Sequence, residues 1–209
     1  MEIVENRAVL VDTRKPHLIT EVLPESQVVK QVLLPGGHTG STVAVKWTLR
    51  NTKILRNLGF KKTPSPITGK YNWPGVYTPM KHQVETAAFM TLHPRAFCLN
   101  DMGTGKTMSV IWAADYLMTK GYIRRVLIVC PLSTMERTWA DEVWKTFPHL
   151  ECAVLYGTRA RRKKMLSLDV DIYIINTDGL KTIQEDLKER SDINLIIVDE
   201  IAMFRNAST

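Results

Sequence analysis

The spacing of apolar residues divides the chain into two regions. In residues 1–62 the apolar residues form three strand-like runs, at 8–11, 27–34 and 42–49. Alternate residues of the third run are apolar, a period of two that is typical of a strand with one buried face. The glycine-rich segment 35–41 predicts a hairpin connection, and 51–58 predicts a short helix that ends at Gly59. Residues 1–62 are therefore predicted to form a small β-rich accessory domain that contacts DNA or a protein partner.

The second region, residues 76–209, follows a proline-containing segment at 63–75 that is predicted to be a linker. Helical spacing of apolar residues predicts helices at 79–92 and 106–120, and a capping box predicts another helix from Ser133. Five short apolar runs predict strands, at 96–99, 126–130, 153–156, 172–175 and 195–198. Strands that alternate with helices favour an α/β fold, in which a parallel sheet has helices on both faces.

The most informative segment lies between the predicted strand at 96–99 and the helix that follows it. It resembles a P-loop, a turn whose backbone N–H groups and helix N-terminus bind phosphate. Its lysine is expected to bind the outer phosphates and its last threonine to bind Mg²⁺. One position departs from the pattern, because Asn100 replaces the first glycine, although asparagine tolerates positive φ. The predicted nucleotide-binding residues are Asn100, Met102, Gly103, Thr104, Gly105, Lys106 and Thr107. The alternative is an ordinary strand-to-helix loop that contains Gly-Lys-Thr.

An acidic pair, Asp199 and Glu200, follows the apolar run 195–198. An aspartate at the carboxyl end of a buried strand can reach the Mg²⁺ that Thr107 binds, and the adjacent glutamate can act as a general base toward water. Lys106, Asp199 and Glu200 are thus the predicted catalytic residues, and Thr107 and Asp199 the predicted metal ligands. The alternative is an acidic pair at the start of a loop.

Composition adds a partner and a compartment to this picture. The formal net charge is +7 and the pI about 9.4, which favours a polyanionic partner such as nucleic acid. Three cysteines without a C-x-x-C pair argue against a disulfide framework or a zinc site. No apolar stretch approaches 18 residues and the N-terminus lacks the charge pattern of a signal peptide, so the expected location is the cytoplasm, without a membrane partner.

The predicted phosphate loop, the helix start at Ser133 and the acidic pair, in this order along the chain, resemble the N-terminal RecA-like lobe of superfamily 2 helicases of the Swi/Snf type. The bacteriophage branch of that group is nearest. The resemblance covers about residues 71–206. It implies that Gln83 reads adenine and that Ser133 and Thr134 bind a DNA strand by its backbone. It also implies DNA contacts by Asn176, Thr177 and Arg205. For Gln83 the alternative is a solvated helix residue. For Ser133 and Thr134 the alternative is to cap the helix, and for Asn176 and Thr177 it is a helix cap by Asp178. For Arg205 the alternative is a contact to a second lobe.

The same resemblance implies the cofactors ATP and Mg²⁺ and a double-stranded DNA partner. Family members need a second RecA-like lobe, in cis or in trans, which carries arginine fingers worth about 10³ to 10⁵ in rate. The chain alone is therefore expected to bind ATP weakly and to hydrolyse it very slowly. Two other functions remain open: a catalytically silent DNA- or protein-binding module and, less favoured, a P-loop kinase.

A basic run at 159–164 has five cations in six positions. It is predicted to be either a solvated helix start or a contact to phosphates, which salt would weaken.

Overall fold

The structure is a computed structural model, and it describes residues 1–200. The chain forms two compact units, which we describe separately. The first unit consists of residues 1–72 and 84–97, and the second unit of residues 73–83 and the described residues from 98 onward. The domain boundary at 63–75 stays a prediction.

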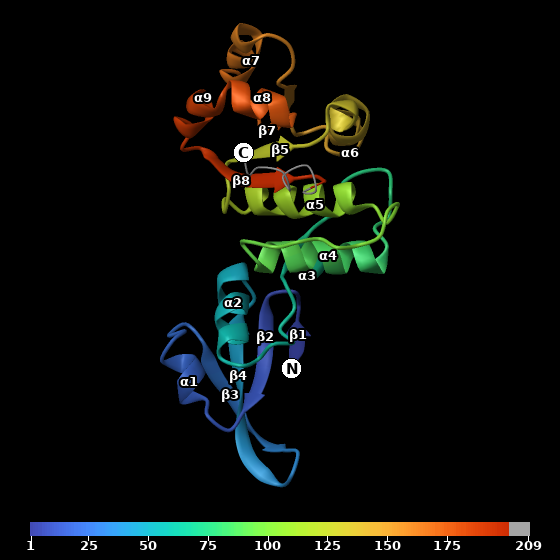
Figure 1. Cartoon of the computed structure of the whole chain (residues 1–209). Coiled ribbons are helices and arrows are strands. Elements are labelled where there is room, and N and C mark those ends of the chain that lie inside the picture. Colours follow the sequence, from blue (N-terminus) through green and yellow to red (C-terminus); the bar gives the residue numbers. More distant parts are fainter. Residues whose placement is uncertain (201–209) are drawn as a thin grey trace. The chain divides into compact units, whose positions relative to one another are not determined.

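The first unit contains a four-stranded antiparallel sheet in the order β1-β2-β4-β3 (Figure 1). The strands are β1 (Glu2–Val4), β2 (Ala8–Thr13), β3 (Gln27–Leu34) and β4 (His38–Lys46). The helices are α1 (His17–Thr20), α2 (Leu49–Asn57), α3 (Ile67–Lys70) and most of α4 (Lys81–Leu92). One face of the sheet and α2 bury a shared apolar core that includes Val9, Val43, Val45, Trp47 and Leu55. This antiparallel sheet confirms the predicted β-rich N-terminal region.

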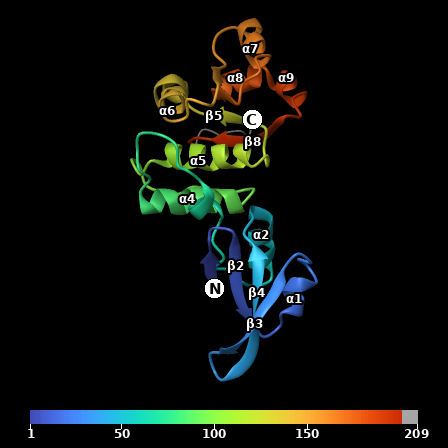
Figure 2. The same ribbon diagram turned by 180° about the vertical axis from the view of Figure 1, so that it is seen from behind.

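The second unit contains a parallel sheet in the order β6-β7-β5-β8. The strands are β5 (Arg125–Val129), β6 (Cys152–Val154), β7 (Ile172–Ile175) and β8 (Ile193–Val198). The helices are α5 (Lys106–Thr119), α6 (Asp141–Thr146), α7 (Arg159–Leu166), α8 (Thr177–Thr182) and α9 (Gln184–Lys188). Both views place the sheet between α5 and the group formed by α7, α8 and α9 (Figures 1 and 2). The arrangement confirms the predicted parallel α/β fold.

The strand predicted at 96–99 is wrong, because residues 93–105 contain neither helix nor strand. The Phe97 side chain is 70% exposed and the Leu99 side chain 88% exposed. Strand backbone needs hydrogen-bonding partners on a neighbouring strand. Among residues 1–200 no strand pairs with this run, and β8 pairs only with β5. An apolar run without a neighbouring strand therefore stays a loop.

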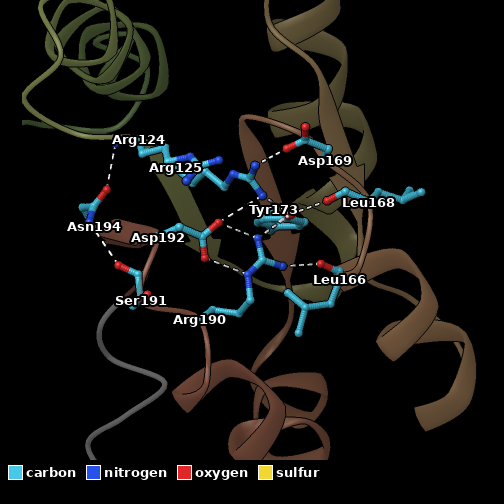
Figure 3. A network of polar contacts seen from close by, with 10 residues as sticks. All are labelled: Arg124, Arg125, Leu166, Leu168, Asp169, Tyr173, Arg190, Ser191, Asp192 and Asn194. Atoms are coloured by element: carbon cyan, nitrogen blue, oxygen red, sulfur yellow. Dashed lines mark hydrogen bonds and ion pairs between the residues drawn. The ribbon is translucent and has the colours of Figure 1, made fainter.

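The amino ends of β5, β7 and β8 are joined by a polar network (Figure 3). Arg190 donates two hydrogen bonds to the Asp192 carboxylate at 2.8 Å each, and Arg125 lies 3.0 Å from the same group. The Tyr173 hydroxyl accepts from both arginines and donates to the Leu168 carbonyl at 2.5 Å. Asp169 also accepts from Arg125. These hydrogen bonds to Arg190, with the nearby charge of Arg125, hold the pKa of Asp192 well below its usual value.

We expect Asp192→Asn to lower the free energy of unfolding by about 2 kcal/mol at pH 7, since the variant loses two charge-assisted hydrogen bonds from Arg190 and the ion pair with Arg125. A carboxyl pKa lowered by folding stabilises fully above the pKa of the unfolded chain, and this contribution is lost as pH falls toward the folded pKa. The difference between wild type and variant should therefore shrink as pH falls below about 5. Urea denaturation at pH 7, 4 and 3 measures it. Asp169→Asn is the control, because the Asp169 side chain is 89% exposed and should contribute little. An Asp192→Asn variant that unfolds like wild type at pH 7 would contradict this prediction.

Candidate functional site

The predicted phosphate loop turns sharply before α5 and depends on two glycines. Gly103 and Gly105 have φ of +75° and +73°, the left-handed region that glycine adopts without strain. Gly105 is the N-cap residue of α5, so the first N–H groups of that helix open toward the loop. A Cβ atom on Gly105 would clash with Nε2 of Gln83, whereas nothing lies within 4 Å of a Cβ on Gly103. The two glycines thus let the chain turn sharply into α5 without backbone strain.

Lys106 lies at the first position of α5 and folds back over the loop. Its ammonium group donates to the carbonyl oxygens of Asn100 and Asp101, at 2.9 and 2.8 Å. The Thr104 hydroxyl also donates to the Asp101 carbonyl, at 2.8 Å. No ion pair links Lys106 to a carboxylate within residues 1–200, so its charge remains available to an anion.

Gln83, the predicted adenine-reading residue, contacts the phosphate loop. Its side-chain oxygen accepts from the Met80 N–H at 2.9 Å, and its Nε2 donates to the Thr104 carbonyl at 3.4 Å. His82 Nε2 lies 3.1 Å from the same carbonyl. Two blocks that are about twenty residues apart in the sequence thus meet at one carbonyl oxygen. Met102, a residue of the same loop, is 95% exposed.

Asp199 follows the last residue of β8, at the carboxyl end of the parallel sheet. Its N–H donates to the Val129 carbonyl at 2.8 Å, and its carboxylate accepts from Trp139 Nε1 at 3.1 Å. Burial raises the pKa of the neighbouring Cys130 thiol to about 11, and the negative charge of Asp199 adds to the rise. Glu200 is exposed and has a φ of +54°, unusual for a residue other than glycine.

Lys106 and Asp199 belong to the same unit, but no ion pair joins them in the described part of the chain. Each is held by other groups, Lys106 by loop carbonyls and Asp199 by an indole N–H. The residues fit Mg²⁺ and a triphosphate by their chemistry. For the triphosphate, the left-handed glycines present backbone N–H groups, and the Lys106 ammonium bonds only to carbonyls among residues 1–200. For Mg²⁺, Thr107 and Asp199 offer the oxygen ligands that this ion prefers.

The predicted capping box at Ser133 is not formed. Pro131 precedes a 3₁₀ turn (Leu132–Thr134) that continues into a π-helix (Met135–Ala140) and then into α6. Ser133 therefore lies inside the helical segment, because that segment begins two residues earlier than the box requires. No side-chain cap bond is present, and the Thr134 hydroxyl donates to the Pro131 carbonyl at 3.0 Å. A pocket of about 290 Å³ lies beside this turn, lined by Leu132, Ser133, Met135, Glu136, Arg137, Val154 and Tyr156.

Asn176 and Thr177 lie where β7 ends and α8 begins. Asn176 is the N-cap residue of α8 but makes no capping bond, because its side-chain oxygen accepts from Arg162 Nη1 at 3.2 Å. The alternative, in which Asp178 caps this helix, is wrong, since Asp178 lies in the first turn. Thr177 begins α8 and is partly exposed.

Arg162 is a structurally important residue that the sequence did not single out. It is only 7% exposed, although it belongs to the basic run at 159–164. Besides Asn176, its guanidinium group donates to the carbonyls of Leu155 and Gly157, and no carboxylate among residues 1–200 pairs with it. A Cβ atom on Gly179 would clash with Arg162 Nη1, so only glycine leaves room there. Arg162 thus ties the ends of β6 and β7 to the start of α8.

The other cations of the run fall into two pairs. Arg159 and Lys163 lie 3.4 and 2.7 Å from the Asp186 carboxylate, and their hydrogen bonds lower the pKa of Asp186. Arg161 and Lys164 are exposed and make no ion pair in the described chain. Three of the five cations therefore have structural partners, and two remain for solvent or phosphate.

Arg205, the last predicted DNA contact, lies outside the described residues. Within residues 1–200 no group of three or more His, Cys, Asp or Glu side chains could hold a metal ion by itself. None of the described helices combines the length and the apolar character that crossing a membrane requires.

Comparisons with known proteins identify a family and a fold. The SNF2-related domain matches residues 82–209. A Caenorhabditis elegans protein is 30% identical over 119 residues, which cover 53% of this chain and 12% of that protein. It is called SWI/SNF-related matrix-associated actin-dependent regulator of chromatin subfamily A containing DEAD/H box 1 homolog. An uncharacterized ATP-dependent helicase of Bacillus subtilis, YqhH, is 24% identical over 136 residues, which cover 64% of this chain and 23% of that protein.

Among solved structures, the Sulfolobus solfataricus SWI2/SNF2 ATPase core in complex with dsDNA superposes with a TM-score of 0.56 at 24% identity. The match covers 66% of this chain and 29% of that one, and it confirms the predicted RecA-like fold. The chain thus spans less than a third of each of these relatives. Because the family match covers more than half of the 209 residues, the chain belongs to the family of proteins with an SNF2-related domain.

Proposed function

We propose that this chain is the ATP-binding lobe of a DNA-dependent ATPase that moves on duplex DNA when a second RecA-like lobe completes it. The observation that carries the proposal is the contact between two separate blocks at the phosphate loop. Gln83 bonds to Thr104 in a loop whose lysine has no carboxylate partner in the described chain. A base-reading amide beside a phosphate-binding turn is the arrangement that one bound nucleotide needs.

In this proposal each residue has one task. Backbone N–H groups of 103–107 and the Lys106 ammonium bind the phosphates, while the Gln83 amide pairs with the edge of adenine. Thr107 and Asp199 hold Mg²⁺, which when bound neutralises charge on the outer phosphates. Glu200 is exposed beside Asp199 and accepts a proton from the attacking water. Ser133, Thr134, Asn176, Thr177 and Arg205 are the proposed contacts to the DNA backbone.

The second lobe supplies the opposite wall of the ATP site and its arginine fingers, so the chain by itself turns over ATP very slowly. The Sulfolobus solfataricus ATPase core was solved in complex with dsDNA, which supports duplex DNA as the partner of this family member too. A place in the bacteriophage branch remains a prediction, and so does a cytoplasmic location.

Calorimetric titration of the purified chain with ATP, with and without Mg²⁺, tests the nucleotide site. We expect saturable binding that strengthens when Mg²⁺ is present, because Thr107 and Asp199 then contribute through the ion. Absence of ATP binding under both conditions would reject the ATPase lobe and favour a catalytically silent binding module.

Gln83→Ala is expected to weaken ATP binding about tenfold while leaving GTP binding nearly unchanged, since one hydrogen-bonding amide is worth about 1.4 kcal/mol. The variant removes a group that bonds to the Thr104 carbonyl, but the loop glycines and Lys106 stay in place. Competition of ATP and GTP against a fluorescent ATP analogue measures the selectivity. Gln31→Ala, an exposed glutamine on β3, is the matched control. Equal losses of ATP and GTP binding in the Gln83 variant would mean that Gln83 supports the loop without reading the base.

A further inference from the structure

The positive charge of the chain is concentrated in its first unit. Residues 1–72 contain 11 Lys and Arg but only 5 Asp and Glu, so they carry +6 of the formal net charge of +7. Residues 26–84 contain 9 Lys and Arg and no acidic residue. The second unit, which holds the proposed ATP site, is thus close to neutral, and the excess charge needs a separate explanation.

Five of these cations lie on one short segment around α2, and we call them the α2 cluster. They are Lys46, Arg50, Lys53, Lys61 and Lys62. Lys46 ends β4, Arg50 and Lys53 lie on α2 itself, and the two remaining lysines follow the turn at Gly59. Four of the five are exposed, and Lys53 is half-buried.

The fold of α2 keeps its two cluster residues, Arg50 and Lys53, on its outer side. Leu49, Asn51, Thr52 and Leu55 are buried, whereas Arg50 and Lys53 are three residues apart and therefore share the opposite side of the helix. The Thr48 hydroxyl accepts from the Asn51 N–H and caps the helix, so α2 begins at a fixed point. Arg56, by contrast, donates to the Thr63 carbonyl at 3.2 Å and holds the chain that follows the helix. Arg50 and Lys53 are thus presented by an ordered helix, and the other three cations of the cluster lie on the segments that flank it.

None of the α2 cluster residues forms an ion pair in the part of the chain that the structure describes. Glu25, an acid that contacts α2, accepts from the side-chain amide of Asn51 at 3.3 Å and, within residues 1–200, forms no ion pair with a cation of the cluster. Burial lowers the pKa of Lys53, because its ammonium group is partly withdrawn from water without a carboxylate in exchange. Neighbouring like charges without acids repel one another, and a polyanion relieves that repulsion.

We propose that the α2 cluster is a second nucleic-acid-binding site, which holds the phosphate backbone of duplex DNA without reading its sequence. Two cations on α2 and three on the segments that flank it offer several contacts to the phosphate backbone, and each contact releases counterions on binding. An anionic membrane is the other polyanionic surface, but helices that bind membranes present an apolar face to lipid. The apolar face of α2 lies in the core of the first unit, with Leu55 fully buried. DNA therefore fits the cluster better.

The test uses the full chain and a fluorescein-labelled 20-base-pair duplex, with binding followed by fluorescence anisotropy between 50 and 200 mM NaCl without nucleotide. Lys61→Gln/Lys62→Gln is compared with Arg14→Gln/Lys15→Gln, which removes the same charge from exposed residues of the first unit outside the cluster. We expect the cluster variant to reduce the slope of log affinity against log salt by about 2, as the loss of two phosphate contacts requires. The control pair should leave the slope unchanged.

A larger variant, Arg50→Gln/Lys53→Gln/Lys61→Gln/Lys62→Gln, should reduce the slope by about 3 to 4 and the affinity at 100 mM NaCl at least tenfold. Circular dichroism establishes whether each variant is folded. If the larger variant is not folded, the Lys61/Lys62 variant still tests the proposal, because it changes only exposed residues beyond the helix. An unchanged slope, or an equal change in the control pair, would overturn the proposal. Binding of the same variants to vesicles of phosphatidylserine and phosphatidylcholine is measured in parallel. Cluster variants that bind the duplex like wild type and lose only their binding to the vesicles would also overturn the proposal.

This inference is independent of the proposed ATPase function, and the two fail separately. ATP binding by the cluster variants should equal that of the wild type, because the α2 cluster and the phosphate loop belong to different units. A chain that binds no ATP but loses DNA binding in the cluster variants would reject the proposed function and keep the second DNA site.

Discussion

Replacing Lys106 with alanine is expected to weaken the binding of ATP in the presence of Mg²⁺ about 100-fold, which corresponds to about 2.7 kcal/mol. Within residues 1–200 the Lys106 ammonium group has only the carbonyls of Asn100 and Asp101 as partners, so a triphosphate can attract it without breaking an ion pair. The variant removes that charge and leaves one exposed and one partly buried carbonyl without this donor, and neither is an ionic group. The fold should therefore be retained while the affinity falls.

Calorimetric titration with ATP measures the loss, and Lys120→Ala is the matched control. Lys120 is an exposed lysine that follows the last residue of the same helix, where it lies over the Tyr116 ring at 5.9 Å. We expect its replacement to change ATP affinity less than twofold, because it lies a whole helix length from the phosphate loop. Similar losses in both variants would mean that the effect comes from overall charge and that Lys106 has no special role.

The second large effect is expected for stability. Arg162→Met should lower the free energy of unfolding by about 3 kcal/mol, because the variant leaves two buried oxygen atoms and a partly buried one without their donor. These acceptors are the carbonyls of Leu155 and Gly157 and the side-chain oxygen of Asn176. Methionine fills much of the same volume, so the loss reports mainly on hydrogen bonds. Arg162→Lys keeps the charge but offers fewer donors in a different geometry, and an intermediate loss is expected.

Urea denaturation followed by circular dichroism measures the loss, with Arg161→Met as the control. Arg161 is the adjacent residue on α7 but is exposed, so its replacement should change stability by less than about 0.5 kcal/mol. Two variants of equal stability would show that the Arg162 hydrogen bonds contribute nothing net to folding.

Much of the fold follows from the spacing of apolar residues. The predicted runs at 27–34 and 172–175 coincide with β3 and β7, and the predicted helix at 106–120 matches α5 to within one residue. These elements form where they were predicted because their apolar spacing, their neighbours in space and the residues at their ends all favour the same secondary structure. The strand predicted at 96–99 failed because apolar composition alone does not supply a neighbouring strand.

The candidate site was predictable to the extent that its chemistry depends on local motifs. Glycines at 103 and 105 indicate a phosphate loop because positive φ is a local requirement, and the structure has it at both positions. The roles of Gln83, Lys106 and Asp199 stay predictions, although the contact between Gln83 and Thr104 brings two of the blocks together. The capping box failed because the helical turn already begins after Pro131.

Arg162 could not be recognised from the sequence, because five cations in six residues look alike there. Only the packing of β6, β7 and α8 separates the buried cation from the two that pair with Asp186 and the two that face water. A residue whose role depends on the ends of several elements carries no local signal.

The backbone at Glu200 has a consequence for how such a chain evolves. With a φ of +54°, this position carries a side chain where glycine would be relaxed, and the strain is about 1 kcal/mol or more. Selection for heat resistance alone would replace the glutamate with glycine or asparagine. Its retention would then indicate a trade-off, in which thermal endurance is sacrificed for turnover at the proposed catalytic carboxylate.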